Sequence, residues 1–354
     1  MVETNPFATL QQITSGYILS RCLHVVADLG VADALDETPR TAAELASLVD
    51  AHPDALRRMM SLLSAHGVFE AQGDRFSHSP ASRLLLKDHP QSMRPFVQVF
   101  GIPLQWQTYG ALEHTLRTGK PATEAVIPEG QWAYLIEHPQ ESDIFNAAMA
   151  SKSHVEVAGV LASYDFSGFR VVGDIGGGLG HFLQAMLKTT PETKGILFDL
   201  PHVIEKAEVI ASERLQLQAG DFFKDTLPVC DAYVLMDVIH DWGDAEAEDL
   251  LRAVRRVAPD EARLILIESI IPDHPGPDWV KVLDIQMMTM IGGLQRTRLQ
   301  YEVLLDKTGF DLTQEINAGA GVSILEAVPY LRPGTIGQPQ RRKQLELIVN
   351  RREQ

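Results

Sequence analysis

Two patterns of hydrophobic residues divide this 354-residue chain. In the first hundred residues apolar positions recur every three to four residues, as in Ile18–Leu35 and Asp54–His66, which predicts amphipathic helices. Thr41 and Glu44 have the spacing of a capping box, which predicts the start of a further short helix between them. A small hairpin is expected over residues 68–77, around a Gln-Gly-Asp turn. Helix, turn, helix and hairpin together outline a winged helix.

From Tyr164 onward, short runs rich in β-branched residues alternate with helical stretches. The expected strands are Arg170–Ile175, Gly195–Asp199, Leu215–Ala219, Ala232–Met236, Arg263–Ile267 and, near the end, Val322–Val328. This alternation predicts an α/β fold, a doubly wound parallel sheet with helices on both faces. We therefore expect a winged-helix domain at 1–100, a helical linker at 101–163 that contributes to a substrate pocket, and an α/β domain at 164–354. A final helix is expected within Gln338–Gln354.

The charge balance narrows the class of partner. Acidic residues outnumber basic ones by 47 to 31, so the formal net charge is −16. Such a chain repels phosphate backbones and anionic lipids, which argues against nucleic-acid and membrane partners. A winged helix also suggests a DNA-binding regulator, but between Arg40 and Lys87 six basic residues face five acidic ones, without a basic stripe.

The remaining composition indicates a cytoplasmic protein. No apolar run approaches the ~20 residues that a membrane-spanning helix needs, and the start of the chain lacks the pattern of a secretory signal. Cys22 and Cys230 are too few for a disulfide framework or a cysteine-rich metal site.

A glycine-rich loop follows the first expected strand of the α/β region. Its sequence runs Asp174-Ile175-Gly176-Gly177-Gly178-Leu179-Gly180, and glycine lets the backbone turn sharply and approach a ligand closely. Asp199 ends the next strand, where a carboxylate can accept hydrogen bonds from ribose hydroxyls. The loop alone fits a nicotinamide dinucleotide, a flavin or an adenosyl cofactor.

Two carboxylates favour the adenosyl cofactor. Asp174 lies just before the glycines, where it would repel a diphosphate and attract an ammonium or sulfonium group. Asp221 and Phe222 follow the third strand, and offer a carboxylate and an aromatic ring at the expected place of an adenine.

His240 and Glu268 follow the fourth and fifth strands. In open α/β sheets, ligands bind beyond the carboxyl ends of the strands, so both side chains are expected at the functional edge. A neutral imidazole can accept a proton near pH 7, and a neighbouring carboxylate can orient it and stabilise its charged form. His240 is therefore a candidate general base.

Taken together, these motifs resemble the S-adenosylmethionine-dependent O-methyltransferases of the plant caffeate and animal hydroxyindole type, which have many bacterial relatives that make aromatic natural products. The resemblance covers nearly the whole chain. It rests on Phe145-Asn146 with Met149, the 174–180 loop, Phe198-Asp199-Leu200-Pro201, Gly220-Asp221-Phe222-Phe223, His240-Asp241-Trp242, and Gly292-Gly293 before Arg296-Thr297.

The resemblance implies a role for each group of residues. It assigns S-adenosylmethionine binding to Asp174, Gly176, Gly178, Asp199, Leu200, Asp221 and Phe222, and catalysis to His240 as general base with Glu268 holding its ring. It places Phe145, Met149, Met287 and Asp241 at the acceptor pocket. It further implies a homodimer, in which the winged helix helps to close the partner's active site, and a small aromatic substrate. No metal is implied.

Three departures from the family pattern are visible. A second catalytic glutamate of the plant enzymes falls on Gln295, which cannot carry negative charge, and an expected lysine four residues before His240 is Met236. The helix before Gly292, which contains Met287, is one residue shorter than in the plant enzymes. The sequence favours O-methyl transfer to an aromatic or polyketide-type hydroxyl. N- or C-methylation of a similar acceptor remains an alternative, as does a non-methylating relative that retains the cofactor, of the hydroxylase or pericyclase type.

Overall fold

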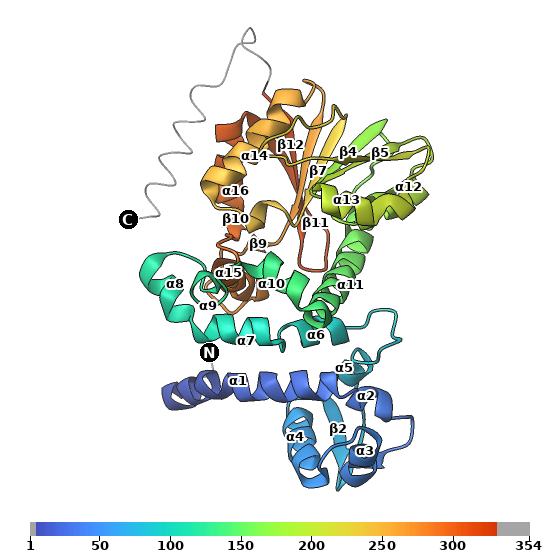
Figure 1. Ribbon diagram of the computed structural model, residues 1–354, viewed down its shortest axis with the longest axis vertical. Helices are drawn as coiled ribbons and strands as arrows, with labels where there is room; N and C mark the ends of the chain where they lie inside the picture. Colours follow the sequence, from blue (N-terminus) through green and yellow to red (C-terminus); the bar gives the residue numbers. More distant parts are fainter. Residues whose placement is uncertain (1–4, 331–354) are drawn as a thin grey trace. The chain divides into compact units, whose positions relative to one another are not determined.

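The computed structural model describes residues 5–330, which form two compact units (Figure 1). The first contains the chain up to Gly110 together with Glu129–Lys152, and the second contains Ala111–Pro128 and the chain from Ser153 onward. The helix expected within Gln338–Gln354 lies outside the described residues.

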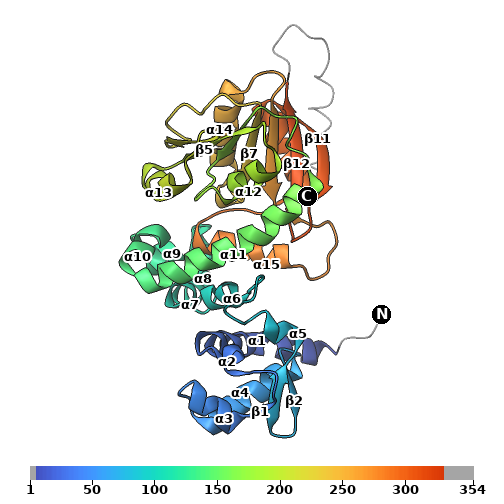
Figure 2. The same ribbon diagram turned by 90° about the vertical axis from the view of Figure 1, so that its right-hand side faces the viewer.

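The first unit contains the winged helix. Its elements are α1 (Pro6–Asp28), α2 (Val31–Ala34), β1 (Arg40–Thr41), α3 (Ala42–Leu48), α4 (Pro53–Ala65), β2 (Phe69–Gln72), β3 (Arg75–His78), α5 (Pro80–Arg83), α6 (Arg94–Val99), α7 (Pro103–Gly110), α10 (Gln131–Glu137) and the first part of α11 (Pro139–Ser163). Figure 2 shows α3 and α4 beside the short strands, whose order is β1-β3-β2.

Local signals set most boundaries of this unit. The capping box at the start of α3 is confirmed, because the Thr41 and Glu44 side chains each accept the other's backbone N–H. The expected single helix over 18–35 is wrong in one respect. The chain starts a new helix after Gly30, whose φ of 68° lies in the left-handed region that glycine adopts without strain. Apolar residues of α1 to α4 and of the hairpin form the core.

The second unit is built on a seven-stranded sheet in the order β11-β12-β8-β7-β4-β5-β6. Its strands are β4 (Val171–Ile175), β5 (Lys194–Asp199), β6 (Leu215–Ala219), β7 (Ala232–Met236), β8 (Arg263–Glu268), β11 (Phe310–Asn317) and β12 (Ser323–Pro329). The five strands β4 to β8 are parallel, as expected, whereas β12 runs antiparallel to both β8 and β11.

The helices of this unit are α8 (Leu112–Thr118), α9 (Thr123–Val126), the end of α11, α12 (His181–Thr189), α13 (Pro201–Ala207), η1 (Glu208–Ile210), η2 (Ile239–Asp241), α14 (Asp244–Val257), α15 (Trp279–Met290) and α16 (Arg298–Thr308). A two-stranded ribbon joins β9 (Ile270–Ile271) to β10 (Arg296–Thr297). Figure 1 shows α14 and α16 on one side of the sheet, and α12 and α13 on the other.

Alternation along the strands divides the core into two layers. In β7, Tyr233 and Leu235 pack into the cluster that contains the apolar face of α14, whereas Val234 packs into the cluster that contains α12. This two-sided burial explains why the parallel strands are continuous apolar runs in the sequence. The carboxyl ends of β4, β5, β7 and β8 consequently meet at one edge, which carries Asp174, Asp199, His240 and Glu268.

Candidate active site

The glycine loop is shaped by backbone conformations that other residues adopt with strain. Gly176, Gly178 and Gly180 have φ values of 74°, 58° and 73°. Gly177 is constrained differently, since a Cβ atom there would lie 2.3 Å from Cγ of Asp174. The loop is thus folded directly over the Asp174 side chain, and the sequence needs glycine at each of these positions.

Asp174 is a buried carboxyl group without a hydrogen-bond partner among the described residues. Burial, and secondarily the charge of Asp199, raises its pKa to about 7. An unpartnered buried carboxylate is costly for the fold, so it indicates a site that a cationic ligand would complete. The residues of the loop therefore fit a cofactor that carries positive charge.

Asp199 connects the glycine loop to the next helix. One carboxylate oxygen accepts the N–H of Gly178 at 2.8 Å, and the other accepts the N–H of Leu200, the N-cap of α13, at 2.7 Å. Burial is the largest cause that raises the pKa of this carboxyl, and the two N–H groups oppose it. The structure thus brings Gly178, Asp199 and Leu200 together, as the sequence predicts.

Asp221 and Phe222 lie at the end of β6. The Asp221 carboxylate accepts hydrogen bonds from Lys224 Nζ at 2.7 Å and from the Phe223 N–H at 2.9 Å, and both lower its pKa, the lysine more strongly. The Phe222 ring meets Trp242 edge to face at 5.9 Å, and a Cβ atom on Gly176 would lie 3.6 Å from it. Phe222 is therefore adjacent to the glycine loop.

His240 lies in the short turn η2 between β7 and α14, and both the residue and its ring are buried. Its Nδ1 atom is 2.9 Å from Oε2 of Glu268, which is fully buried at the end of β8. The other oxygen of Glu268 accepts the N–H groups of Val238 and Ile239 at 3.2 and 2.8 Å. One carboxylate thus fixes the turn and the ring at once.

Two further carboxylates flank the imidazole. Asp237 Oδ1 lies 3.7 Å from Nδ1, and Asp241 Oδ1 lies 3.4 Å from Nε2. Burial alone would lower the pKa of His240, but the charges of Glu268, Asp241 and Asp237 and the hydrogen bond from Glu268 outweigh it and raise the pKa to about 9. The ring is therefore a stronger base than an isolated histidine.

Sequence reasoning did not select Asp237 as a site residue. It has a φ of 55°, one of three positive values among non-glycine residues in 5–330, and aspartate tolerates this conformation better than most side chains. Its position three residues before His240 was the available signal. Asp237, His240 and Glu268 are also the one trio of potential metal ligands that gathers in the described part of the chain. Hydrogen bonds already account for the Glu268 carboxylate in this trio.

The other predicted site residues lie in different places. Met287 is half-buried near the end of α15 in the second unit, whereas Phe145 and Met149 lie on the part of α11 that belongs to the first unit. Phe145 packs edge to face against Trp132 at 5.8 Å. Gln295, the position of the missing glutamate, is fully buried, and its amide atoms have no hydrogen-bond partner among residues 5–330.

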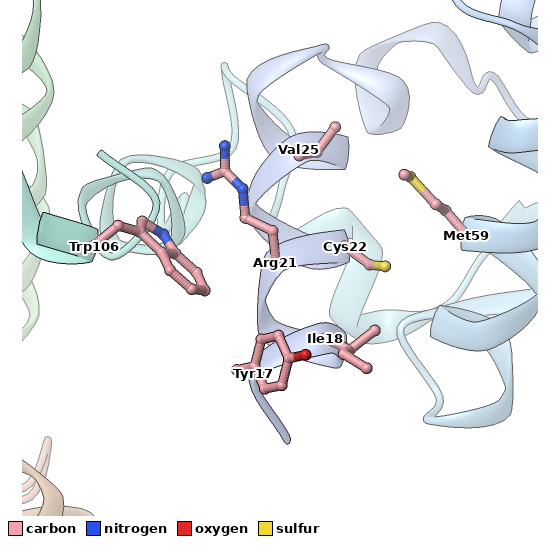
Figure 3. Close-up of a pocket in the computed structure, with 7 residues that line it drawn as sticks. All are labelled: Tyr17, Ile18, Arg21, Cys22, Val25, Met59 and Trp106. Carbon is pink, nitrogen blue, oxygen red and sulfur yellow. The ribbon is translucent and has the colours of Figure 1, made fainter. Parts of the chain in front are cut away.

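A separate groove of about 360 Å³ lies in the first unit (Figure 3). It is lined by Tyr17, Ile18, Arg21, Cys22, Val25, Met59 and Trp106. The Arg21 guanidinium lies 5.6 Å from the centre of the Trp106 ring, a cation–π contact, and donates to the Gly101 carbonyl at 2.7 Å. The lining is otherwise mainly apolar, which is typical of a packing surface.

Comparisons with known proteins agree with this architecture. Residues 11–88 match the O-methyltransferase dimerisation domain, and residues 109–311 match the O-methyltransferase domain. The chain therefore belongs to the O-methyltransferase family. It is an S-adenosylmethionine-dependent methyltransferase, which confirms the fold class, the enzyme class and the cofactor that the sequence motifs imply.

Individual relatives cover nearly the whole chain. A phenazine O-methyltransferase of Lysobacter antibioticus is 34% identical over 326 residues, which cover 90% of this chain and 95% of the relative. The 8-amino-8-demethylriboflavin N,N-dimethyltransferase of Streptomyces davaonensis is 38% identical over 315 residues, 86% of this chain and 90% of the relative. The crystal structure of a calicheamicin-biosynthesis methyltransferase in its SAH-bound form superposes with a TM-score of 0.85 at 28% identity, covering 93% of this chain and 99% of that one.

Of the helices within residues 5–330, none is long and apolar enough to cross a membrane.

Replacement of the buried carboxyl by an amide should separate stability from cofactor binding. Because the folded-state pKa of Asp174 is raised, the fold loses stability as pH rises from about 4 through 7. Asp174→Asn should therefore raise the Tm of the ligand-free protein by a few degrees at pH 8, with a smaller gain toward pH 4. It should also weaken S-adenosylmethionine binding measured by calorimetry. Asp273→Asn, at an exposed position of the same unit, is the control and should change neither quantity. An unchanged cofactor affinity in Asp174→Asn would contradict the proposed contact.

Removal of the charge of Glu268 should lower the basicity of His240. In the folded protein the pKa of His240 is raised from 6.5 to about 9. The pairing of the protonated ring with Glu268 therefore stabilises the fold fully below pH 6.5, and this stabilisation is lost as pH rises through about 9. In Glu268→Gln the acid limb of the kcat/KM profile should move to lower pH, and kcat should fall by about 10²- to 10⁴-fold as ring orientation is lost. If the acid limb of the kcat/KM profile of Glu268→Gln stayed at the same pH as in the wild type, Glu268 would not set the pKa of His240.

Proposed function

We propose that the protein methylates a hydroxyl group of a small aromatic acceptor, with His240 as general base. The observation that carries this proposal is the 2.9 Å hydrogen bond between His240 Nδ1 and Glu268 Oε2. It fixes the ring through Nδ1, so that Nε2 is the nitrogen available to an acceptor hydroxyl.

The residue chemistry suits a phenol. With a pKa near 10, a phenol is largely protonated at neutral pH and is a weak nucleophile until its proton leaves. When bound, S-adenosylmethionine supplies an electrophilic methyl group on a sulfonium. As the new C–O bond forms and the C–S bond breaks, His240 accepts the hydroxyl proton and Glu268 stabilises the imidazolium. The products are a methyl ether and S-adenosylhomocysteine.

Alignment of the two substrates supplies much of the remaining rate enhancement, a contribution that can reach roughly 7–11 kcal/mol. We assign cofactor binding to Asp174, Gly176, Gly178, Asp199, Leu200, Asp221 and Phe222. The acceptor pocket is assigned to Phe145, Met149, Met287 and Asp241. Asp241 is supported by its 3.4 Å distance from Nε2, which places a carboxylate beside the reacting hydroxyl.

The relatives support an aromatic acceptor. They include a phenazine O-methyltransferase, a mitomycin biosynthesis O-methyltransferase and a 3-amino-4-hydroxybenzoate 4-O-methyltransferase. The riboflavin-analogue N,N-dimethyltransferase supports an aromatic amine as the second candidate acceptor. A neutral aromatic amine attacks without prior loss of a proton, so the buried His240–Glu268 pair favours the hydroxyl.

The acceptor chemistry can be tested with matched compounds. The purified protein is incubated with S-adenosylmethionine and a panel of polycyclic phenols, each paired with its amine analogue, and products are analysed by mass spectrometry. We expect a gain of one methyl group on oxygen. Methylation of the amines alone would establish the second candidate.

The catalytic role of His240 is tested by truncation. His240→Ala should lower kcat by about 10²- to 10⁴-fold, because it removes the proton acceptor. The affinity for S-adenosylmethionine should change little. His274→Ala removes an exposed histidine of the same unit and serves as the control. Wild-type turnover in His240→Ala would disprove the assigned mechanism.

The first unit supports a homodimer. Phe7, Leu10, Ile13 and Tyr17 are exposed on one side of α1, at helical spacing, and α1 overlaps the dimerisation-domain match. The groove of Figure 3 begins at Tyr17 and continues this apolar surface. Exposed apolar patches of this kind are typical of protein–protein interfaces, and we propose that a second copy of the chain covers it.

Introduction of charge into this surface should separate the subunits. Leu10→Glu combined with Ile13→Glu should convert the dimer to a monomer in light scattering, because two carboxylates would be buried without partners. Gln12→Glu adds one charge on the opposite side of α1 and should leave the dimer intact. A dimer of unchanged affinity in the double variant would exclude this surface as the interface.

A further inference from the structure

The turn that carries His240 depends on its neighbours for its position. Within η2 the backbone makes two local hydrogen bonds, from Asp241 to the Val238 carbonyl at 3.2 Å and from Trp242 to the Ile239 carbonyl at 3.3 Å. Glu268 holds the N–H side of the turn. Within the turn, the Ile239 carbonyl accepts only the long bond from Trp242, and the carbonyls of His240 and Trp242 accept no local bond, so donors from outside the turn are needed to hold this side.

The segment before α16 supplies donors to all three carbonyls. The Leu294 N–H donates to the His240 carbonyl at 2.8 Å. Gly293 permits this approach, since a Cβ atom there would lie 2.2 Å from the same carbonyl oxygen. Its φ is not in the left-handed region, so close contact rather than backbone conformation requires glycine here.

Arg296 supplies the other two donors. Its guanidinium donates to the Ile239 carbonyl at 3.2 Å and to the Trp242 carbonyl at 3.0 Å, and it pairs with Asp244 through Nη2 at 2.7 Å and Nε at 3.0 Å. Arg296 is the largest side chain that is fully buried, with 1% of its surface exposed. Burial of a guanidinium is costly unless its N–H groups are hydrogen-bonded. Here those N–H groups donate to carbonyls on both sides of His240 in the chain.

Arg296 is also tied to the strand that carries Glu268. It opens β10, which pairs in parallel with β9, and Arg296 lies opposite Ile270, two residues beyond Glu268. Arg296 holds the carbonyl side of the turn and Glu268 holds its N–H side. Both are therefore fixed to the same stretch of backbone, residues 268–271.

We infer that Arg296 is a positioning residue for the methyl-transfer reaction: it clamps the carbonyls on either side of His240 so that the imidazole keeps its alignment with Glu268. This inference rests on the proposed role of His240. It gives a physical reason for Gly293 and Arg296 in the Gly292-Gly293 and Arg296-Thr297 motif.

The test compares Arg296→Lys with a matched arginine elsewhere. Lysine keeps the charge but cannot span two carbonyls and a carboxylate with a planar fork. In Arg296→Lys we expect kcat to fall by about 10- to 100-fold, since displacements near 1 Å cost up to about 10²-fold. The titration of the His240 ring in ligand-free protein, followed by NMR, should shift to lower pH as the Glu268 contact loosens. The affinity for S-adenosylmethionine should stay within about twofold to threefold.

Arg214→Lys is the control. Arg214 likewise donates to backbone carbonyls, those of Leu187, Thr190 and Thr193, but it precedes β6 and so lies at the amino ends of the parallel strands, away from His240. This variant should lower Tm without changing kcat or the His240 titration. Gly293→Ala, which presses on the His240 carbonyl, should act in the same direction as Arg296→Lys.

The outcomes separate this inference from the proposed function. If Arg296→Lys lowers Tm as Arg214→Lys does, while kcat and the ring titration stay at wild-type values, the clamp is wrong although His240 remains the base. If His240→Ala retains turnover, the proposed function fails, whatever Arg296 does to the ring.

Should Arg296→Lys not fold, Asp244→Asn carries the test. The Asp244 side chain is 66% exposed, so its replacement is tolerated, and removal of its charge weakens the pairing that helps to hold the Arg296 guanidinium. It should lower kcat and shift the titration in the same direction by a smaller amount, and wild-type values would again overturn the clamp.

Discussion

The carboxylate of Glu268 joins the sheet, the η2 turn and the His240 ring. One oxygen accepts two backbone N–H groups of the turn, and the other accepts His240 Nδ1. Glu268 ends β8, a central strand that is buried from Leu264 onward, so the hydrogen bond from Glu268 fixes the imidazole to the core. A buried carboxylate costs least when its lone pairs accept hydrogen bonds, and here each bond that Glu268 accepts also orients His240, the proposed base. The acceptor side of the site depends on this arrangement.

The cofactor side depends on a charge that the fold leaves unsatisfied. Asp174 lies below Gly177 without a hydrogen-bond partner among residues 5–330, and three glycines with positive φ bend the loop over it. The fold accepts this cost at the end of β4, two strands from β8, where a cationic ligand would offset it. In the proposed mechanism, the Asp174 carboxylate would face the methyl donor and the carboxylate-supported His240 would face the acceptor, a division of charge that suits methyl transfer.

Features set by local sequence could be predicted, and those set by long-range pairing could not. The parallel strands, the capping box at Thr41 and the glycine loop follow from patterns within a few residues. The antiparallel strand β11 was missed because its middle is exposed at the sheet edge and lacks the apolar run of the central strands. The proximity of Asp237 to the ring depends on its left-handed φ, and the bonds of Arg296 join residues more than 50 positions apart. The sequence places Asp237 three residues before His240 but does not show this backbone conformation, and it does not show which distant carbonyls Arg296 contacts.

The protonation state of the His240 ring tests the central role of Glu268 most directly. In ligand-free protein with ¹⁵N-labelled histidine, we expect the neutral ring to carry its proton on Nδ1, with a downfield proton resonance from the bond to Glu268. We expect this ring to titrate well above 6.5, in line with a pKa of about 9. A neutral ring protonated on Nε2, or a titration at or below 6.5, would contradict the account, because the carboxylate would then not be holding the base.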